Sequence, residues 1–302
     1  MDNAEFNPRP GSVDSPEPGI RRILAPNPSP MTFRGTNTYL IGQGDVVVVD
    51  PGPALPAHHS AILAALNAGE RISHILVTHS HIDHSPLAQA LSASTGAKIY
   101  AYGDSYCGRS AIMEQLSKAG LTGGGEGLDP DFAPQERLGD GDRLVVGGQV
   151  ITALWTPGHF GNHLCFGYGD AVFTGDIIMG WASTMVSPPD GDLSAFLGSA
   201  AMLAELNARI FYPGHGAPVL NPTGRANWLI KHRKSREQEI LAQLGGTGQS
   251  IADITAAIYT DVPSALLPAA ERNVLAHLID LSQRDLVLAE PSLSHKAVFS
   301  KT

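Results

Sequence analysis

The 302-residue sequence contains only two cysteines, Cys107 and Cys165. It also has no apolar run that approaches the roughly 20 residues a membrane helix requires. Two cysteines are too few for a disulfide framework, so we expect two reduced thiols rather than a redox pair. Residues 1–19 contain Pro, Asp and Glu but no basic start followed by an apolar core, which predicts a flexible tail and not a secretory signal. These absences predict a cytoplasmic protein without a membrane segment.

Aromatic residues are also scarce, at 6% of the chain, and the formal net charge is −9. Proteins that bind single-stranded nucleic acid usually present a basic groove with stacking aromatic side chains. The composition therefore argues against a nucleic-acid surface, although it does not exclude a local basic groove.

One dense basic run stands out, Lys231-His232-Arg233-Lys234-Ser235-Arg236. One interpretation is a patch that steers an acidic substrate, such as RNA phosphates or a coenzyme A nucleotide, towards the active site. The other is a solvated helix face, since Glu237 and Glu239 lie close by and offer partial neutralisation.

A cluster of potential metal ligands stands at the end of the apolar, strand-like run 72–78. The segment His79-Ser80-His81-Ile82-Asp83-His84 has the pattern H-x-H-x-D-H. Three imidazoles and a carboxylate in one crowded turn would each need a polar partner, and a cation satisfies all of them. The pattern predicts a metal site, and the alternative is a histidine-rich surface loop.

Three more ligand-type side chains follow strand-like segments. His159 comes after the run 150–154 on a Pro-Gly turn, Asp176 closes the run 171–176, and His215 closes the segment 210–215. Each alone is typical of a structural turn or a capping group, but four such strand ends in order predict one shared site.

Imidazole and carboxylate ligands without any thiolate favour zinc and leave iron and manganese as alternatives. Two cations about 3.5–4 Å apart lower the pKa of a bridging water towards about 7 and polarise a carbonyl or phosphoryl oxygen. Asp83 can orient the resulting hydroxide, so no serine or cysteine nucleophile is needed.

This ordered set resembles the metallo-β-lactamase superfamily, with Val47-Val48-Val49-Asp50-Pro51-Gly52 similar to its first motif. The resemblance implies a binuclear zinc hydrolase with Asp83 and Asp176 as catalytic residues and Asp50 behind the ligands. It assigns His79, His81 and His159 to one zinc. It assigns Asp83, His84 and His215 to the second, with Asp176 bridging both.

The resemblance also implies an α+β fold, a four-layer αββα sandwich, over residues 20–224. The local patterns agree with it. They predict a hairpin of residues 38–41 and 46–49, helices at 57–68, 86–94 and 193–208, strands at 72–78 and 97–101, and three strand-like runs between 142 and 176. The glycine-rich segment 120–134 predicts a loop, either a surface insertion or a lid.

Residues 225–302 predict a second, smaller unit. A long helix at 225–244 ends at Gly245-Gly246, and helices at 251–259 and 268–281 precede a hairpin that contains Leu286-Val287-Leu288. This order resembles the winged-helix extension of the lactamase-β-like protein 2 branch, as does Gly35-Thr36-Asn37-Thr38-Tyr39-Leu40. A winged helix by itself does not indicate DNA binding.

Three residues near the expected ligands have two interpretations each. His163 either contacts substrate or packs as a buried histidine; it follows Asn162, where the resembled branch commonly has an acidic residue. Trp181 is a pocket wall or a core residue. Tyr212 donates to an oxyanion or is a strand tyrosine with its hydroxyl at the surface.

Three functions fit these patterns. The first is hydrolysis of small-molecule acyl substrates, with thioesters ahead of esters and lactones. The second is a metal-dependent endoribonuclease acting on single-stranded RNA, and the third is a non-catalytic metal-binding protein. The low aromatic content and negative charge favour acyl chemistry. No membrane partner is expected, and the sequence leaves a homodimer open.

Overall fold

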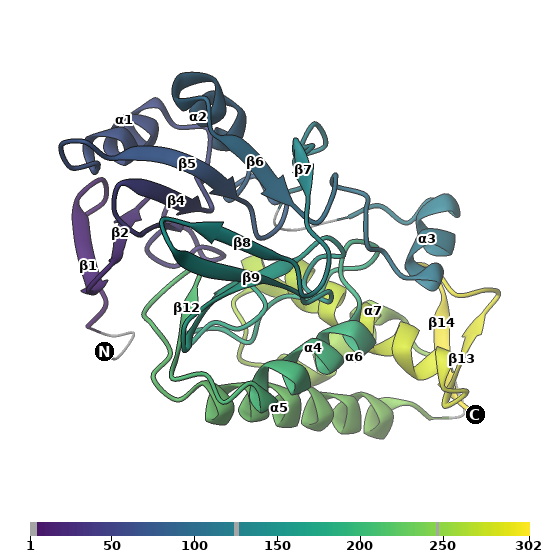
Figure 1. Cartoon of the computed structure of the whole chain (residues 1–302). Helices are drawn as coiled ribbons and strands as arrows, with labels where there is room; N and C mark the ends of the chain where they lie inside the picture. Colours follow the sequence, from purple (N-terminus) through teal and green to yellow (C-terminus); the bar gives the residue numbers. More distant parts are fainter. Residues whose placement is uncertain (1–4, 124–126, 246–247) are drawn as a thin grey trace.

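The computed structural model describes residues 5–123, 127–245 and 248–302. Two β-sheets face each other, and helices cover the outer face of each (Figure 1). The first sheet has seven strands in chain order: β1 Val13–Glu17, β2 Ile20–Leu24, β3 Asn37–Ile41, β4 Asp45–Val49, β5 Arg71–Leu76, β6 Lys98–Ala101 and β7 Glu136–Arg137. The second has five, in the order β12 Ile210–Pro213, β11 Ala171–Gly175, β10 Leu164–Tyr168, β9 Gln149–Trp155 and β8 Arg143–Val146.

The first sheet combines an antiparallel and a parallel half. β3 and β4 form the predicted hairpin, with Val48 opposite Leu40. From β4 onwards the strands are parallel, because α1 (Pro56–Ala64) and α2 (Leu87–Thr95) connect them as crossovers. Both helices bury their apolar side chains against this sheet's outer face.

The second sheet is an antiparallel meander from β8 to β11, and β12 adds to it in parallel after helix α4 (Leu193–Glu205). The region 142–176 thus contains four strands rather than the predicted three. The pair Gly147-Gly148, with both φ angles positive, turns the chain between β8 and β9.

The inner faces of the two sheets enclose an aromatic-rich core. Tyr39 from the first sheet packs against Phe173 and Tyr212 from the second, with ring centroids 5.0 and 5.6 Å away. This core and the two helical layers confirm the predicted four-layer αββα sandwich.

The prediction of a flexible tail over residues 1–19 is wrong for the residues that the structure describes. β1 pairs with β2, and Phe6 is fully buried. Arg22 donates to both carboxylate oxygens of Asp14 and lies 4.6 Å from the Phe6 ring centroid. The polar composition misled the prediction, because the partner that orders the segment comes from the next strand.

The C-terminal region contains α5 Pro222–Gln243, α6 Ile251–Ile258, a short 3-10 helix Ser264–Leu266, α7 Leu267–Gln283 and the hairpin of β13 Val287–Glu290 with β14 Val298–Lys301. The long helix begins at Pro222, since the Asn221 side chain accepts from the Gly224 amide, and its C-cap is Leu244. Gly245 follows, and Gly246 lies outside the described residues. Because α5 packs along α4, the expected boundary at residue 225 falls inside a helix shared with the sandwich.

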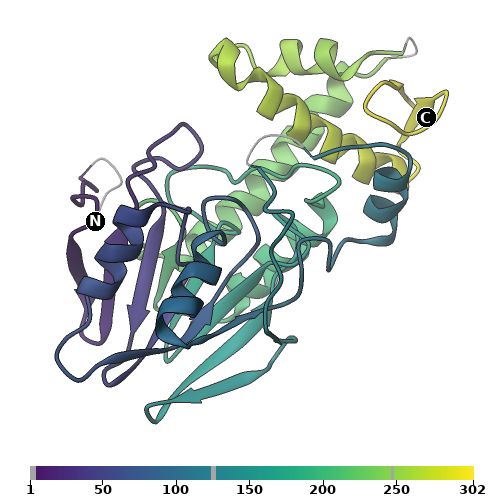
Figure 2. The same cartoon turned by 90° about the horizontal axis from the view of Figure 1, so that it is seen from above.

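Helix α3 (Ala111–Lys118) has no counterpart among the elements predicted from the sequence. Its Met113 and Leu116 join the core of the C-terminal region, so α3 lies beside that region although it precedes the second sheet in the chain (Figure 2). The loop 120–134, whose residues 124–126 lie outside the described part, is anchored to two cores by buried Leu121 and Phe132. Both described ends of this loop are therefore fixed to the protein.

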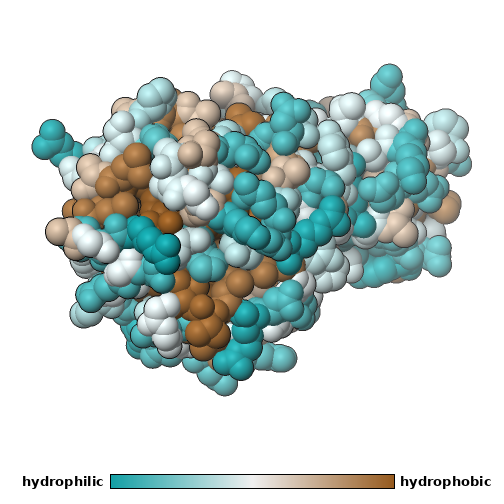
Figure 3. All heavy atoms as spheres, turned by 45° about the horizontal axis from the view of Figure 1, so that its top comes forward, coloured by the Kyte–Doolittle hydropathy of each residue, from teal (hydrophilic) through white to brown (hydrophobic). Residues whose placement is uncertain are grey.

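The face seen in Figure 3 is largely hydrophilic, with separate hydrophobic patches. Among the described residues, no helix combines the length and apolar character needed to span a membrane.

Candidate metal centre

Seven ligand-type side chains converge where four strands end. His79, His81, Asp83 and His84 follow β5, while His159, Asp176 and His215 follow β9, β11 and β12. The two sheets thus contribute to one cluster, which the sequence pattern predicted.

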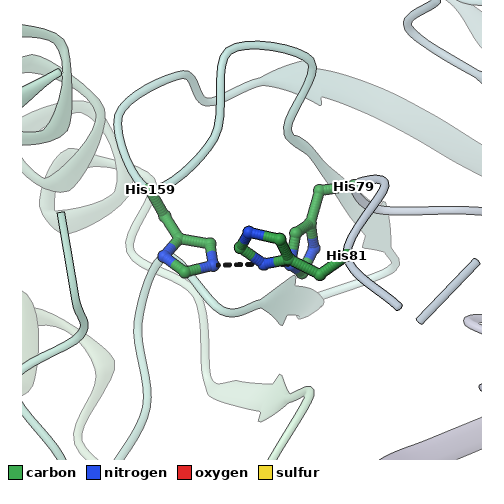
Figure 4. Close-up of side chains that lie close together, drawn as sticks. All are labelled: His79, His81 and His159. Carbon is green, nitrogen blue, oxygen red and sulfur yellow. Dashed lines mark hydrogen bonds between the residues drawn. The ribbon is translucent and has the colours of Figure 1, made fainter. Parts of the chain in front are cut away.

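The first group consists of His79, His81 and His159, whose rings approach one another in Figure 4. The Nδ1 atom of His81 lies 2.9 Å from His79 Nε2 and 3.1 Å from His159 Nε2. All three residues are buried.

The second group consists of Asp83, His84 and His215. His215 Nε2 lies 3.1 Å from Asp83 Oδ2 and 3.3 Å from His84 Nε2. Asp176 reaches both groups: its Oδ2 atom is 3.1 Å from His215 Nε2 and 4.0 Å from His159 Nε2.

In three of the histidines, the ring nitrogen that points away from the cluster has a hydrogen-bond acceptor beside it. His84 Nδ1 is 2.9 Å from Asp50 Oδ2, His159 Nδ1 is 2.8 Å from the Met185 carbonyl oxygen, and His215 Nδ1 is 3.1 Å from that of Gly35. A carbonyl oxygen requires an N–H at Nδ1, so in His159 and His215 the Nε2 atom faces the cluster and is the nitrogen that can bind a metal once it carries no proton. Asp50 lies behind a ligand, as expected, and it also accepts the amide and hydroxyl of Thr78.

The charges in the cluster call for a cation. Burial and the neighbouring imidazoles lower the pKa of His79 and of His81 well below the ordinary value, so both rings are neutral. Burial alone would also lower the pKa of His215, but Asp176 and Asp83 outweigh it and raise that pKa to about 10. The buried Asp176 carboxylate and the partly exposed Asp83 carboxylate hold extra positive charge beside neutral imidazoles, a donor set that fits divalent metal ions.

The glycine before each isolated histidine is required by close packing. A Cβ atom at Gly214 would lie 2.4 Å from Asp176 Oδ1, and one at Gly158 would lie 2.3 Å from Phe196 Cα. The motif Pro-Gly-His therefore occurs twice because no larger residue fits before either ligand.

His163 is fully buried and is not among the described residues that line the two cavities beside the cluster. Its Nδ1 atom is 2.8 Å from Thr156 Oγ1, and its Nε2 atom accepts the amide of Asp176 at 3.3 Å. The residue thus holds the backbone of Asp176, which agrees with a packed histidine and not with a substrate contact.

The two aromatic candidates, Trp181 and Tyr212, lie in different surroundings. Trp181 is partly exposed and stacks on Phe33, with ring centroids 5.1 Å apart. Tyr212 packs between the sheets, and its side chain lines a separate cavity with Asp14 and Arg22. The suggested role of Tyr212 as an oxyanion donor is therefore wrong, because a strand side chain that points into the inter-sheet core cannot face the ligands.

The basic run on α5 does not form one surface. Lys231 and Lys234 are exposed, but Arg233 is 2% exposed and donates to the carbonyl oxygens of Ser183 and Thr184. Arg236 pairs with Glu239. Arg233 therefore belongs neither to a patch that steers substrate nor to a solvated helix face, and both interpretations of the run are wrong for this residue.

Two cavities flank the cluster. The larger, about 510 Å³, contacts His81 and His159, and its apolar wall includes Leu121, Leu128 and Met185. The smaller, about 310 Å³, contacts three further ligand-type residues: Asp83, Asp176 and His215. These walls were not predicted from the sequence, because they come from loops without a motif.

Comparison with known proteins agrees with this geometry. Residues 31–215 match the metallo-beta-lactamase superfamily, and residues 250–295 match the beta-lactamase associated winged helix domain. A beta-lactamase-like protein 2 homolog of Drosophila melanogaster is 30% identical over 87% of this chain and 88% of its own. An atrochrysone carboxyl ACP thioesterase of Aspergillus fumigatus is 32% identical over 77% of this chain and 67% of its own.

A crystal structure of a beta-lactamase domain protein from Burkholderia ambifaria has the same fold, with a TM-score of 0.81, 22% identity and coverage of 99% of this chain and 96% of its own. The chain therefore belongs to the metallo-beta-lactamase superfamily of metal-dependent hydrolases and carries a C-terminal winged-helix domain.

Proposed function

We propose that this protein is a binuclear zinc hydrolase of acyl thioesters. The observation that carries the proposal is the assembly of seven ligand-type side chains between two cavities. His79, His81 and His159 would hold one zinc, Asp83, His84 and His215 the other, and Asp176 would contact both. When bound, the two ions would supply a water molecule acidified towards a pKa of about 7 and would polarise the acyl carbonyl group.

The protein's own residues complete the site. Of the three ligand-type residues at the smaller cavity, Asp83 has the most exposed side chain, at 15%. Its Oδ2 atom accepts from Thr36 Oγ1 at 3.3 Å. From this position the carboxylate can hold the proton of the attacking water. The larger cavity, with its apolar wall beside His81 and His159, suits an acyl group.

A thiol nucleophile is not needed and Cys165 cannot provide one. Its side chain is fully buried, and burial raises its pKa to about 12. The preference for thioesters among acyl substrates is supported by the relative from Aspergillus fumigatus, which is an ACP thioesterase.

The test is free-thiol release from a panel of acyl-glutathione and acyl-coenzyme A thioesters by zinc-loaded protein whose metal content is measured. We expect two zinc ions per chain and metal-dependent thiol release that Asp176→Ala abolishes. Asp170→Ala is the matched control, because Asp170 lies exposed at the other end of β11 and should retain activity. No release by protein that carries two zinc ions would overturn the proposal and favour cleavage of single-stranded RNA.

A further inference from the structure

The loop of residues 179–187, which follows Asp176, is held by side chains from the C-terminal helices. On α5, Arg225 donates to the carbonyl oxygens of Met179 and Ala182, at 2.7 and 2.6 Å. Arg233, two turns further along, donates to those of Ser183 and Thr184. We call residues 179–187 the His159 support loop, because its Met185 carbonyl group accepts from His159 Nδ1.

Asn273 on α7 joins this contact. Its side-chain oxygen accepts from Arg233 Nη1 at 3.0 Å and from the Val186 amide at 3.1 Å. The residues on both sides of Met185 are therefore fixed: Thr184 by Arg233, and Val186 by Asn273. The carbonyl group that orients His159 lies between these two attachments.

Two features show that these contacts hold the loop in a conformation it would not otherwise prefer. Thr184 has a φ of 54°, in the left-handed region that a β-branched residue adopts only when its surroundings impose it. Arg233 is 2% exposed, so its guanidinium group has exchanged water for backbone carbonyl groups. A buried cation in this position is retained only while all of its acceptors stay in place.

We infer that Arg233 and Asn273 are positioning residues for the metal centre, which hold the Met185 carbonyl group against His159 and thereby set the geometry of the group His79, His81 and His159. The inference rests on the proposed metal-dependent function. It gives the winged-helix region a part in holding the metal ligands, since Asn273 belongs to that region.

The guanidinium group suits this role because its planar fork donates to Ser183, Thr184 and Asn273 at the same time. A lysine would keep the charge but could not reach the three acceptors in one plane. Arg233→Lys should therefore behave like Arg233→Met in metal binding, although it is the milder change for folding.

The experiment measures binding of Co²⁺ to metal-free protein by visible absorption and by competition with a chelator, without substrate. We expect Arg233→Met, Arg233→Lys and Asn273→Ala to weaken one of the two sites by about 10- to 100-fold and to alter its spectrum, while the other site is retained. Lys231→Met, an exposed change on the same helix, should bind both ions like the wild type.

A double-mutant cycle with His159→Ala separates positioning from general loss of stability. Once His159 is absent, Arg233→Lys should have no further effect on metal affinity. An undiminished effect in that background, or wild-type affinity of the folded single variants at both sites, would overturn the inference. If Arg233→Met does not fold, Asn273→Ala carries the same test, because it leaves the arginine in place. Failure of the wild type to bind metal would overturn the proposed function instead.

Discussion

Each Pro-Gly-His turn places a ligand directly against its neighbours, so the residue before the ligand decides whether the site can form. At Gly214 a methyl group would collide with the Asp176 carboxylate and the His84 ring, which are themselves ligand-type groups. At Gly198, on helix α4, a methyl group would meet no atom within 4 Å. These two glycines form a natural pair for comparison.

Gly214→Ala should abolish binding of at least one metal ion and lower kcat by about 100-fold or more, because Asp176 or His84 must move. Gly198→Ala should leave activity unchanged and stabilise the protein by about 0.5–1 kcal/mol, since alanine is the better helix residue. Metal analysis, kinetics and urea unfolding of both variants check this. Full metal content in Gly214→Ala would contradict the described packing.

Asp83→Ala should lower kcat by about 100-fold or more while the fold is retained, because it removes a ligand and the group that holds the water proton together. Circular dichroism and steady-state kinetics on a thioester provide the measurement. Wild-type activity in this variant would refute the assignment of the site.

His58 offers a pH prediction away from the ligands. The ring is buried, its Nε2 atom lies 2.8 Å from Thr38 Oγ1, and burial lowers its pKa from 6.5 to about 4. Between pH 6.5 and about 4, His58 therefore binds a proton in the unfolded chain but not in the folded protein. The stability from this group is present above pH 6.5 and is lost as the pH falls towards 4.

The loss amounts to a slope of at most about 1.4 kcal/mol per pH unit. His58→Gln removes the titrating group, so its free energy of unfolding should fall less steeply with acid than that of the wild type. Urea unfolding of both proteins at several pH values between 7 and 4.5 measures the two slopes. Equal slopes would show that His58 titrates normally in the folded protein.

At the scale of one element, α5 shows how a helix divides a continuous charged run. Leu229, Arg233 and Ile240 are spaced four and seven residues apart, so they share the buried face, whereas Lys231 and Lys234 point outwards. This spacing was the signal that could have identified Arg233 as buried, because the flanking apolar residues on its face predict it.

Charge reversal of the exposed lysines, Lys231→Glu with Lys234→Glu, should change kcat/KM for acyl-glutathione and acyl-coenzyme A by less than about twofold, since solvated charges on a helix surface are screened. Kinetics with both thioesters at low and physiological salt check this. A loss restricted to the coenzyme A substrate at low salt would restore the steering interpretation.

On the scale of the whole molecule, the candidate metal centre connects the two sheets. Four of its seven side chains follow β5 of the first sheet, and three follow strands of the second. Bound ions would therefore join segments that are otherwise held together by the inter-sheet core. Metal removal should accordingly affect stability as well as activity.

We expect a strong chelator to abolish thioester hydrolysis and to lower Tm by several degrees, and two equivalents of zinc to restore both. A ligand that binds the folded state and not the unfolded chain stabilises it by about 2.7 kcal/mol at 100 times its Kd. Calorimetry of the metal-free and zinc-loaded forms is the measurement. Identical Tm values would mean that the ions contribute nothing to holding the sheets together.

The sequence by itself determined the ligand-type residues, their order and most of the elements that carry them. His79 to His84, His159, Asp176 and His215 each follow a strand-like run, and the positions of such runs depend on local hydrophobic patterns. The C-terminal helices and hairpin were predictable for the same reason.

Only the tertiary structure decided what depends on contacts between distant segments. Three examples are the formation of strand β1, the direction of the Tyr212 side chain and the burial of Arg233. Each is set by a partner that lies elsewhere in the chain or on another layer. The acceptors that orient His159 and His215 are backbone carbonyl groups, which carry no sequence signal. A residue pattern can state which groups are available, but burial and hydrogen bonding depend on which segments the fold brings together.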